Sequence, residues 1–300
     1  MPFLLIGTAI MAQNTQPATK TTSADSLLNS MNTGDKNQPV VIFKSTRLVL
    51  TQSTETDKKK NFNFEIIHRF GDFAGTNGGA KLGYGLDDVS DVDFRFEYGL
   101  TDNLNIDLER STIYGLIDLE LKYAIVHQTN DGSSPIAITV LGESGVRTFA
   151  SFPTFGSRLS YFGQAIFARQ FSPGFSLELA PSYLRDNSQY PAIAGVEQQF
   201  VTLSAAARFK LTKHMGFIVD YAHPFSSFRN SSSRFSDPLG FGLEMVTGGH
   251  VFTVNVTNSR ANTEINYLSD TRSDYGRGQY RIGFTISRMF DFNHKETYKQ

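Results

Sequence analysis

Acidic and basic side chains gather at alternate positions between residues 65 and 122, a pattern that could act on charged solutes. The acidic members are Glu65, Asp91, Asp93, Glu97, Asp107, Glu109, Asp118 and Glu120, and the basic members are Arg69, Arg95 and Lys122. Rings of charged side chains set the ion preference of a pore, so one hypothesis is a wall that favours cations. The alternative hypothesis is a set of ion pairs between neighbouring strands that fills and stiffens the interior.

Two further basic groups could act with this acidic sector. Arg208, Lys210 and Arg281 follow the same polar alternation, and we expect them on the wall opposite the acidic residues. Segment 41–61 carries Lys44 and Arg47 within an apolar run. We hypothesise that part of 41–60 folds into or across the periplasmic mouth, where these two cations would meet the acidic sector. The alternatives are an additional strand or a segment that binds a periplasmic partner.

Catalysis would require a nucleophile or water, a base and an orienting group within hydrogen-bonding reach. The histidines are His68, His127, His214, His223, His250 and His294, and only His223 has tempting neighbours, Asp220 and Ser226. Residues of these types are common in loops. No metal-ligand spacing, phosphate-binding loop or nucleotide fingerprint is present. We therefore predict that the protein is not an enzyme and has no catalytic residues, cofactor or metal site.

The elements that must position these residues are strands, because apolar and polar residues alternate with a period of two. In the segment 117–125, for example, Ile117, Leu119 and Leu121 alternate with Asp118 and Glu120. The pattern predicts twelve strands, near 62–70, 91–100, 104–109, 117–125, 136–146, 158–170, 175–183, 201–210, 215–221, 239–245, 252–257 and 279–287. The register of the sixth strand is ambiguous. Most segments approach the roughly 9–11 residues of a tilted transmembrane strand.

The connections between these strands alternate in length. Short turns fall at 101–102, 128–135, 171–174, 212–213 and 247–249, and longer segments rich in Gly, Ser, Asn and Asp fall at 71–89, 147–157, 186–197, 226–237 and 259–276. The short connection at 111–114 is the exception. Outer-membrane barrels show this asymmetry, with tight periplasmic turns and longer outer loops. It places both termini on the periplasmic side.

Composition is consistent with a membrane barrel but leaves a soluble β-sandwich or barrel as the alternative. The 300-residue chain has 28 Lys and Arg, 29 Asp and Glu, 26 Phe, 12 Tyr, no Cys and no Trp. A net charge of −1 gives no basic field for nucleic acid. The absence of Cys excludes disulfides and thiol chemistry. Long strands with an almost uncharged apolar face favour an antiparallel up-and-down transmembrane β-barrel of about 12 strands.

The sequence divides into five parts. Residues 1–12 resemble a signal peptide with cleavage after Ala12, the alternative being a disordered hydrophobic tip. Residues 13–40 are polar and indicate a flexible linker. Residues 41–61 form the N-terminal segment that we expect to be a plug or a strand at the mouth. Residues 62–290 form the barrel, and residues 291–300 form a polar tail.

Several motifs resemble those of an uncharacterised Bacteroidetes family of outer-membrane β-barrel proteins. They are Phe43 to Arg47, Asn63 to Gly71, Tyr84 to Asp87, Phe96 to Asp102, Gly248 to Phe252 and Thr257 to Ser259. The resemblance covers roughly residues 40–290. It implies a barrel in the bacterial outer membrane with no assigned activity, and it adds no catalytic residue.

These observations lead to three functional hypotheses. The leading one is a porin-like passive channel for small polar solutes or ions. The second is a closed structural or interaction barrel of an envelope complex, and the third is a lipid-modifying enzyme. The expected partners are outer-membrane lipid and the barrel assembly machinery, with a periplasmic partner as a further candidate, and no nucleic acid.

Overall fold

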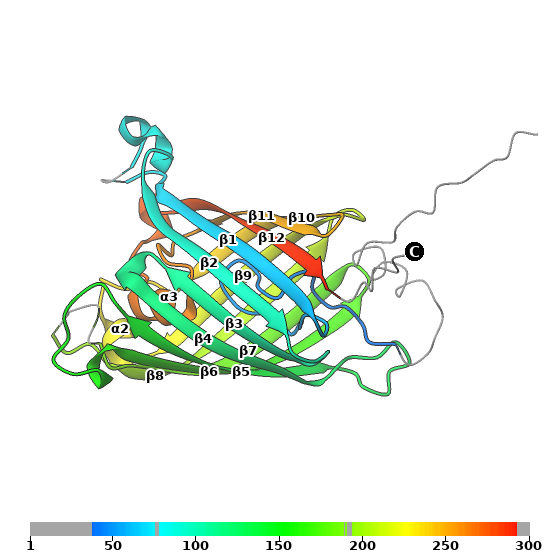
Figure 1. Cartoon of the computed structure of the whole chain (residues 1–300). Coiled ribbons are helices and arrows are strands. Elements are labelled where there is room, and N and C mark those ends of the chain that lie inside the picture. Colours follow the sequence, from blue (N-terminus) through cyan, green and yellow to red (C-terminus); the bar gives the residue numbers. More distant parts are fainter. Residues whose placement is uncertain (1–37, 76–77, 189, 191–193, 293–300) are drawn as a thin grey trace, which may run out of the picture.

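The computed structural model describes residues 38–75, 78–188, 190 and 194–292. In this part of the chain, twelve antiparallel strands form one closed barrel (Figure 1). The strands are β1 (Asn61–Asp72), β2 (Val89–Gly99), β3 (Leu104–Ser111), β4 (Leu116–Val126), β5 (Ala137–Arg147), β6 (Leu159–Ser172), β7 (Phe175–Asp186), β8 (Gln199–Lys210), β9 (Met215–Phe225), β10 (Leu239–Thr247), β11 (His250–Thr257) and β12 (Arg281–Asp291). Each strand pairs with its neighbours in sequence, and β1 pairs with β12. The predicted up-and-down barrel is confirmed.

Side chains alternate between the two faces of the barrel wall as the period-two pattern predicts. On β4, Ile117, Leu119 and Leu121 are exposed on the outer face, whereas Asp118 and Glu120 are buried on the inner face. Outward-facing rings also meet across strands, as Phe217 and Phe241 do at 6.4 Å. An apolar outer face with a charged inner face is the reverse of a soluble barrel, in which the apolar face points inward.

Two ends of the barrel are distinguished by their connections. We call the end where the described chain begins at residue 38 and stops at residue 292, and where most of the short connections lie, the turn end, and the opposite end the loop end (Figure 1). The loop end carries the helices α2 (Ser227–Ser231) and α3 (Glu264–Asp270) and the short 3-10 turns η1 (Ala80–Gly85), η2 (Ile113–Gly115), η3 (Gly156–Arg158) and η4 (Tyr275–Arg277). Within the described residues, no helix combines the length and the apolar character needed to cross a membrane.

The interior is filled by two segments that are not strands. Residues 42–54, which we call the lumen hairpin, contact β2, β4, β5, β7 and β9, strands that surround the barrel axis. A segment in contact with so many sides of the barrel lies inside it, as Figure 1 shows for the blue stretch before β1. Residues 258–271, which include α3 and which we call the lumen loop, are buried except for Arg260 and enter from the loop end.

The strands β6 to β9 turn apolar as well as polar residues inward. Phe162 and Ile166 fix the ambiguous register of β6, because both are buried on the inner face. Leu184 of β7 and Ile218 of β9 are buried in the same cluster as Ile42, Phe43, Leu48 and Leu50 of the lumen hairpin. The alternation predicts a polar or small face on each strand, and these large apolar residues on the inner face depart from that pattern. The apolar patch exists because the hairpin offers an apolar surface to cover it.

The structure describes only some of the five predicted parts of the chain. Segment 1–12, most of segment 13–40 and nearly all of segment 291–300 lie outside the described residues. The loops at the loop end fall at 73–88, 112–115, 148–158, 187–198, 226–238 and 258–280, close to the predicted long connections.

Candidate functional site: the occupied lumen

The lumen hairpin turns tightly at its tip. Arg47 and Gln52 form an antiparallel bridge, and the backbone N–H of Leu48 donates to the carbonyl oxygen of Thr51 at 2.9 Å. The backbone N–H of Ser53 donates to the carbonyl oxygen of Thr46 at 2.8 Å. The turn places the apolar residues 48–50 at the deepest point of the segment. The polar residues on its two arms then face the charged wall.

Two glycines of β10 make room for the tip. A Cβ atom at Gly240 would lie 2.6 Å from Cγ1 of Val49, and one at Gly242 would lie 2.8 Å from Cγ2 of Val49. Real Cβ atoms do not approach carbon this closely, so any larger residue would displace the hairpin. Glycine in a strand interior often marks such a close approach. Gly240 and Gly242 therefore form the seat of Val49.

Asp220 of β9 holds the backbone of the tip. Its Oδ2 atom accepts hydrogen bonds from the backbone N–H groups of Leu50 at 2.8 Å and Thr51 at 2.9 Å. The hydroxyl of Thr51 also donates to Oε1 of Glu178 on β7 at 3.2 Å. Hydrogen bonds to a carboxylate are about twice as strong as neutral ones. Asp220 thus satisfies two backbone donors that have no partner within the turn.

Arg95 of β2 is the centre of the acidic sector. Its guanidinium pairs with Asp107, lies 3.4 Å from Glu120 and 3.7 Å from Glu65, and donates to Gln52 of the hairpin. Ion pairs between strands are therefore present, as the second hypothesis for these charges required. They neutralise only some of the acids.

Arg47 joins the two segments that fill the lumen. Its Nη2 atom lies 2.8 Å from Glu264 of α3 and 3.2 Å from Glu109 of β3, and its Nη1 atom donates to the carbonyl oxygen of Asn262 at 2.7 Å. Asn262 in turn accepts from Arg69 of β1 at 2.7 Å. Burial raises the pKa of Glu264 to about 7, with Glu109 acting in the same direction and Arg47 opposing both.

Strand register aligns acids directly opposite acids. Glu97, Asp107, Glu120 and Glu143 are successive cross-strand partners on β2, β3, β4 and β5. Glu109 faces Asp118 in the adjacent row. Like charges in direct cross-strand positions are destabilising unless something neutralises them. The register therefore concentrates negative charge on one wall.

The acidic excess extends through the buried interior. Among the described residues, seventeen buried acidic side chains are accompanied by eight buried basic ones. The acids are Asp57, Glu65, Asp72, Asp91, Asp93, Glu97, Asp107, Glu109, Asp118, Glu120, Glu143, Glu178, Asp186, Asp220, Glu244, Glu264 and Asp270, and the bases are Arg47, Arg69, Arg95, Lys122, Arg147, Arg208, Arg229 and Arg281. Buried charge is costly unless it is paired, so protons or cations must balance the excess.

The structure corrects the placement of three basic residues. Arg281 is not on the opposite wall, because β12 pairs with β1, and it lies 2.7 Å from Asp72 at the loop end. Lys210 is exposed at the turn end of β8. Lys44 does not meet the sector of β1 to β4. Its charged neighbours are Arg208, Glu55, Glu244 and Lys210, and burial, assisted by Arg208, lowers its pKa.

The other predicted lining residues are buried. Arg208 is on the opposite wall, where its Nη2 atom lies 2.6 Å from Glu244. Lys122 donates to the carbonyl oxygen of Thr46 at 2.9 Å. The prediction missed Glu143, Glu178, Asp220, Glu244 and Glu264. The first four could have been found because they occupy the polar alternation of their strands, whereas Glu264 lies in a loop that carries no periodic signal.

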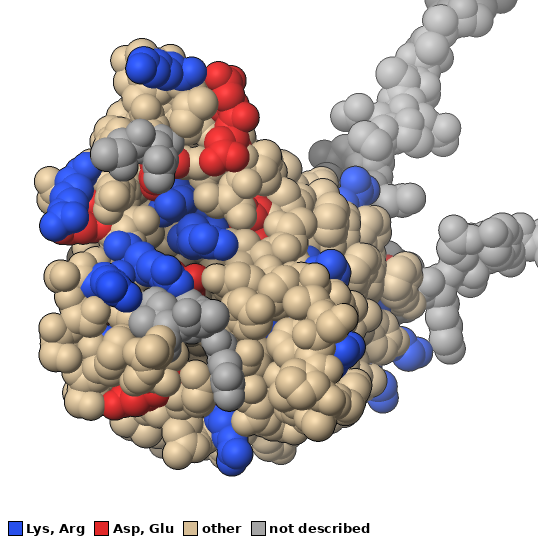
Figure 2. Space-filling view, turned by 90° about the vertical axis from the view of Figure 1, so that its left-hand side faces the viewer, with Lys and Arg blue, Asp and Glu red and all other residues tan. Residues whose placement is uncertain are grey.

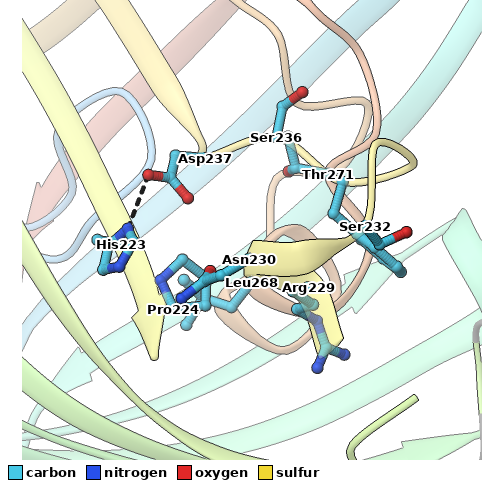
Figure 3. A pocket seen from close by; sticks show the side chains of 10 residues that line it. His223, Pro224, Arg229, Asn230, Ser232, Ser236, Asp237, Leu268 and Thr271 are labelled. Atoms are coloured by element: carbon cyan, nitrogen blue, oxygen red, sulfur yellow. Dashed lines mark hydrogen bonds and ion pairs between the residues drawn. The ribbon is translucent and has the colours of Figure 1, made fainter. Parts of the chain in front are cut away.

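A cavity of about 340 Å³ lies at the loop end, between the end of β9, segment 226–238 and α3 (Figure 3). His223 lines it, and its Nδ1 atom lies 2.8 Å from Oδ2 of Asp237. Asp220 is instead fully buried against the hairpin, and Ser226 caps α2 by accepting from the backbone N–H of Arg229. The three residues His223, Asp220 and Ser226 therefore do not act together. Among the described residues, no three His, Asp or Glu side chains are arranged to hold a metal ion.

The loop end is rich in basic side chains, which Figure 2 shows around the centre of this face. Exposed members include Arg234, Arg260 and Arg272. Arg260 lies over the ring of Tyr114 at 5.7 Å, and Arg272 pairs with Asp270 of α3. The surface charge at this end thus has the opposite sign to the wall below it.

The closed barrel, apolar outside and charged inside, defines a membrane-bound β-barrel protein. Residues 43–290 match the family described as Membrane bound beta barrel domain (DUF5777), and the chain belongs to that family. The family carries no assigned function.

Solved structures of porins and channels are similar in fold. The NanC porin is 8% identical, with a TM-score of 0.46, and the match covers 76% of this chain and 98% of that one. The KdgM porin is 9% identical, with a TM-score of 0.45 and coverage of 77% and 99%. An outer membrane channel from Pseudomonas putida F1 is 8% identical, with a TM-score of 0.47 and coverage of 83% and 100%. No curated protein sequence matches.

Proposed function

We propose that this protein is a porin-like passive channel of the bacterial outer membrane that favours small cations or polar solutes and is closed by its lumen hairpin. The observation that carries the proposal is the excess of seventeen buried acids over eight buried bases among the described residues. A barrel that serves only as a scaffold gains nothing from unbalanced charge, because apolar packing of similar volume is as stable or more stable. A pore gains cation preference from it.

The attachment of the hairpin supports its role as a gate. The lumen hairpin precedes β1, and it meets the wall through side chains and through its tip rather than as a thirteenth strand. Its withdrawal would leave the β1–β12 pairing and every other strand ladder intact. The turn end, through which it would leave, faces the periplasm in this proposal because the short connections lie there.

A reversible disulfide lock tests whether the hairpin must move. The hydroxyl of Thr139 on β5 donates to the carbonyl oxygen of Thr54 at 2.9 Å, and the chain contains no cysteine. The double variant Thr54→Cys/Thr139→Cys should conduct in planar bilayers when reduced and fall silent when oxidised. Each single variant serves as the control, since it cannot form the lock. Equal conductance before and after oxidation, with the disulfide verified by mass spectrometry, would refute the gate.

Deletion of residues 41–57 gives a second test. The deletion should raise the open probability and the unit conductance, and reversal potentials in a salt gradient should show cation preference. Circular dichroism and heat-modifiable migration verify that the barrel has folded. Unchanged conductance in a folded barrel would show that the hairpin does not limit flux.

The second candidate function is a closed barrel that serves an envelope complex. The lumen loop favours it, because α3 is fully buried and fills the lumen from the other end. A full-length protein that never conducts, whether locked or reduced, would support this alternative over the channel.

A further inference from the structure

Arg47 pairs with carboxylates from two different elements. Its guanidinium contacts Glu109 and Glu264, and Glu109 lies directly across from Asp118 on the next strand. Glu143 of β5 interacts electrostatically with Glu264 and Glu109. We call these four acids with Arg47 the Arg47 site. One arginine thus pairs with two carboxylates and interacts electrostatically with two more.

Several oxygens of the Arg47 site have no partner. Both carboxylate oxygens of Glu143, one of Asp118, one of Glu109 and one of Glu264 are buried and accept no hydrogen bond. Glu143 is 7% exposed and Glu264 is fully buried. Buried carboxylate oxygens are ordinarily satisfied, so orphaned ones call for a ligand or water. Oxygen donors of this kind are those that Ca²⁺ and similar hard cations take.

We propose that divalent cations such as Ca²⁺ compete with Arg47 for these four carboxylates, so that cation concentration controls insertion of the lumen hairpin. The proposal rests on the proposed function in that the hairpin withdraws. With Arg47 inserted, no three acids among the described residues are arranged to hold a metal ion, so the cation would bind only after the hairpin withdraws. With Arg47 withdrawn, Glu109 and Glu264 lose their partner and become available.

The competition has a thermodynamic form. A ligand that binds only the withdrawn state shifts the equilibrium toward it, and the hairpin weakens cation binding by the same factor. The hairpin is therefore a tethered competitor of the cation. Among the described residues of the hairpin, only Arg47 forms an ion pair with Glu264. The competition between hairpin and cation therefore depends mainly on this one side chain.

Thiol accessibility measures the shift without requiring conductance. Val49→Cys places a single cysteine at the hairpin tip, where the native residue is 3% exposed. The maleimide labelling rate of the full chain in detergent should rise about tenfold as Ca²⁺ reaches about 10 mM, a coupling within the usual range for linked sites. N-methylglucamine chloride at equal ionic strength, which screens charge but is too large for the site, should leave the rate low.

Two variants separate cation binding from general charge effects. Asp118→Asn/Glu143→Gln keeps both ion-pair partners of Arg47 but removes two cation ligands, and it should abolish the Ca²⁺ response. Asp102→Asn/Asp131→Asn removes two exposed acids at the turn end and should respond as the parent does. A Ca²⁺ response retained in the first variant would overturn the proposal.

The outcomes also distinguish this proposal from the gate itself. Arg47→Gln in the Val49→Cys background should label rapidly at every Ca²⁺ concentration. If this variant labels rapidly while the parent ignores Ca²⁺, the hairpin moves but cations do not control it, and only the present proposal fails. If neither responds, the hairpin does not withdraw and the proposed function fails with it.

Discussion

The guanidinium of Arg47 lies 2.8 Å from the carboxylate of Glu264, a residue 217 positions later in the chain. This contact ties the segment that enters at the turn end to the loop that enters at the loop end. Both partners are almost completely excluded from solvent, at 4% and 0% exposure. The two segments that fill the lumen are therefore joined by an ion pair, although neither of them is a strand of the barrel.

Replacing Arg47 with Gln should favour withdrawal of the hairpin. The change leaves Glu109 and Glu264 without their cation, and loss of one partner of a buried pair costs about 3 kcal/mol. Hydrogen exchange of the amides in residues 46–53 should accelerate strongly. Lys58→Gln, which removes an exposed charge from the same segment, should leave exchange unchanged. Slow exchange in Arg47→Gln would show that the pair does not hold the hairpin.

A methyl group at Gly240 should expel the tip. Gly240→Ala places a Cβ 2.6 Å from Val49, and overpacking of this kind costs about 1–3 kcal/mol. The double variant Gly240→Ala/Val49→Ala should recover most of the loss, because the shorter side chain vacates the space. Gly142→Ala is the matched control, since nothing lies within 4 Å of a Cβ there. Unfolding midpoints in denaturant give the comparison, and equal losses in the single and double variants would contradict it.

Asp220→Asn should loosen the tip without emptying the lumen. Both amides donate to the same oxygen of Asp220, and the carbonyl oxygen of Asn can take that position, but it carries no charge and accepts weaker hydrogen bonds, so a loss of about 1–3 kcal/mol is expected. The amides of Leu50 and Thr51 should exchange faster than in the parent. Glu178→Gln touches the Thr51 hydroxyl but neither amide, and it should have a smaller effect on them. An equal effect of both changes would count against a specific role for Asp220.

Acidification should favour the inserted hairpin. The pKa of Glu264 is about 7 with the hairpin inserted, because burial raises it more than Arg47 lowers it, and withdrawal would hydrate this carboxyl and lower its pKa. Protons bind the state with the higher pKa more tightly, and the inserted state therefore gains stability relative to the withdrawn one as the pH falls through about 7. The charged and titratable groups that face Glu264 are Arg47, Arg95, Glu109, Glu120, Glu143 and Tyr267.

The pH effect is measured with the Val49→Cys thiol. Its labelling rate, divided by that of an exposed thiol at Lys58→Cys to remove the reactivity of the thiol itself, should fall between about pH 8 and about pH 6. Glu264→Gln should flatten this part of the profile. An unchanged slope in Glu264→Gln would assign the titration to another carboxylate of the set.

Alternation identified the barrel because a wall with lipid on one side and polar groups on the other imposes a period of two on every strand. The same pattern placed Asp118 and Glu120 inside and Leu119 outside, as the structure has them. It could not place Arg281, since closure of the sheet makes the last strand a neighbour of the first. Sequence order alone does not reveal which strands become adjacent on closure.

The interior contents were harder to predict than the wall. Charge predicted that both Arg47 and Lys44 would meet the acidic sector, and Arg47 does so. Lys44, three residues earlier, faces another side of the barrel, because the hairpin points these two side chains in different directions. Glu264 and Asn262 gave no signal, since buried loops have no periodicity. Gly240 and Gly242 replace side chains on the inner face of β10, and the position of Val49 gives the reason.

The separation of charge also affects how the molecule meets its surroundings. Of the chain's 28 basic and 29 acidic residues, 8 and 17 are buried in the described part, which leaves 20 basic and 12 acidic residues in the rest of the chain. Some of these lie outside the described residues, but on the described part the exposed charged residues are mainly basic, although the net charge of the chain is −1. Cation-exchange resins and anionic lipid surfaces should retain it as they would a basic protein, although its sequence isoelectric point of about 6.6 suggests otherwise.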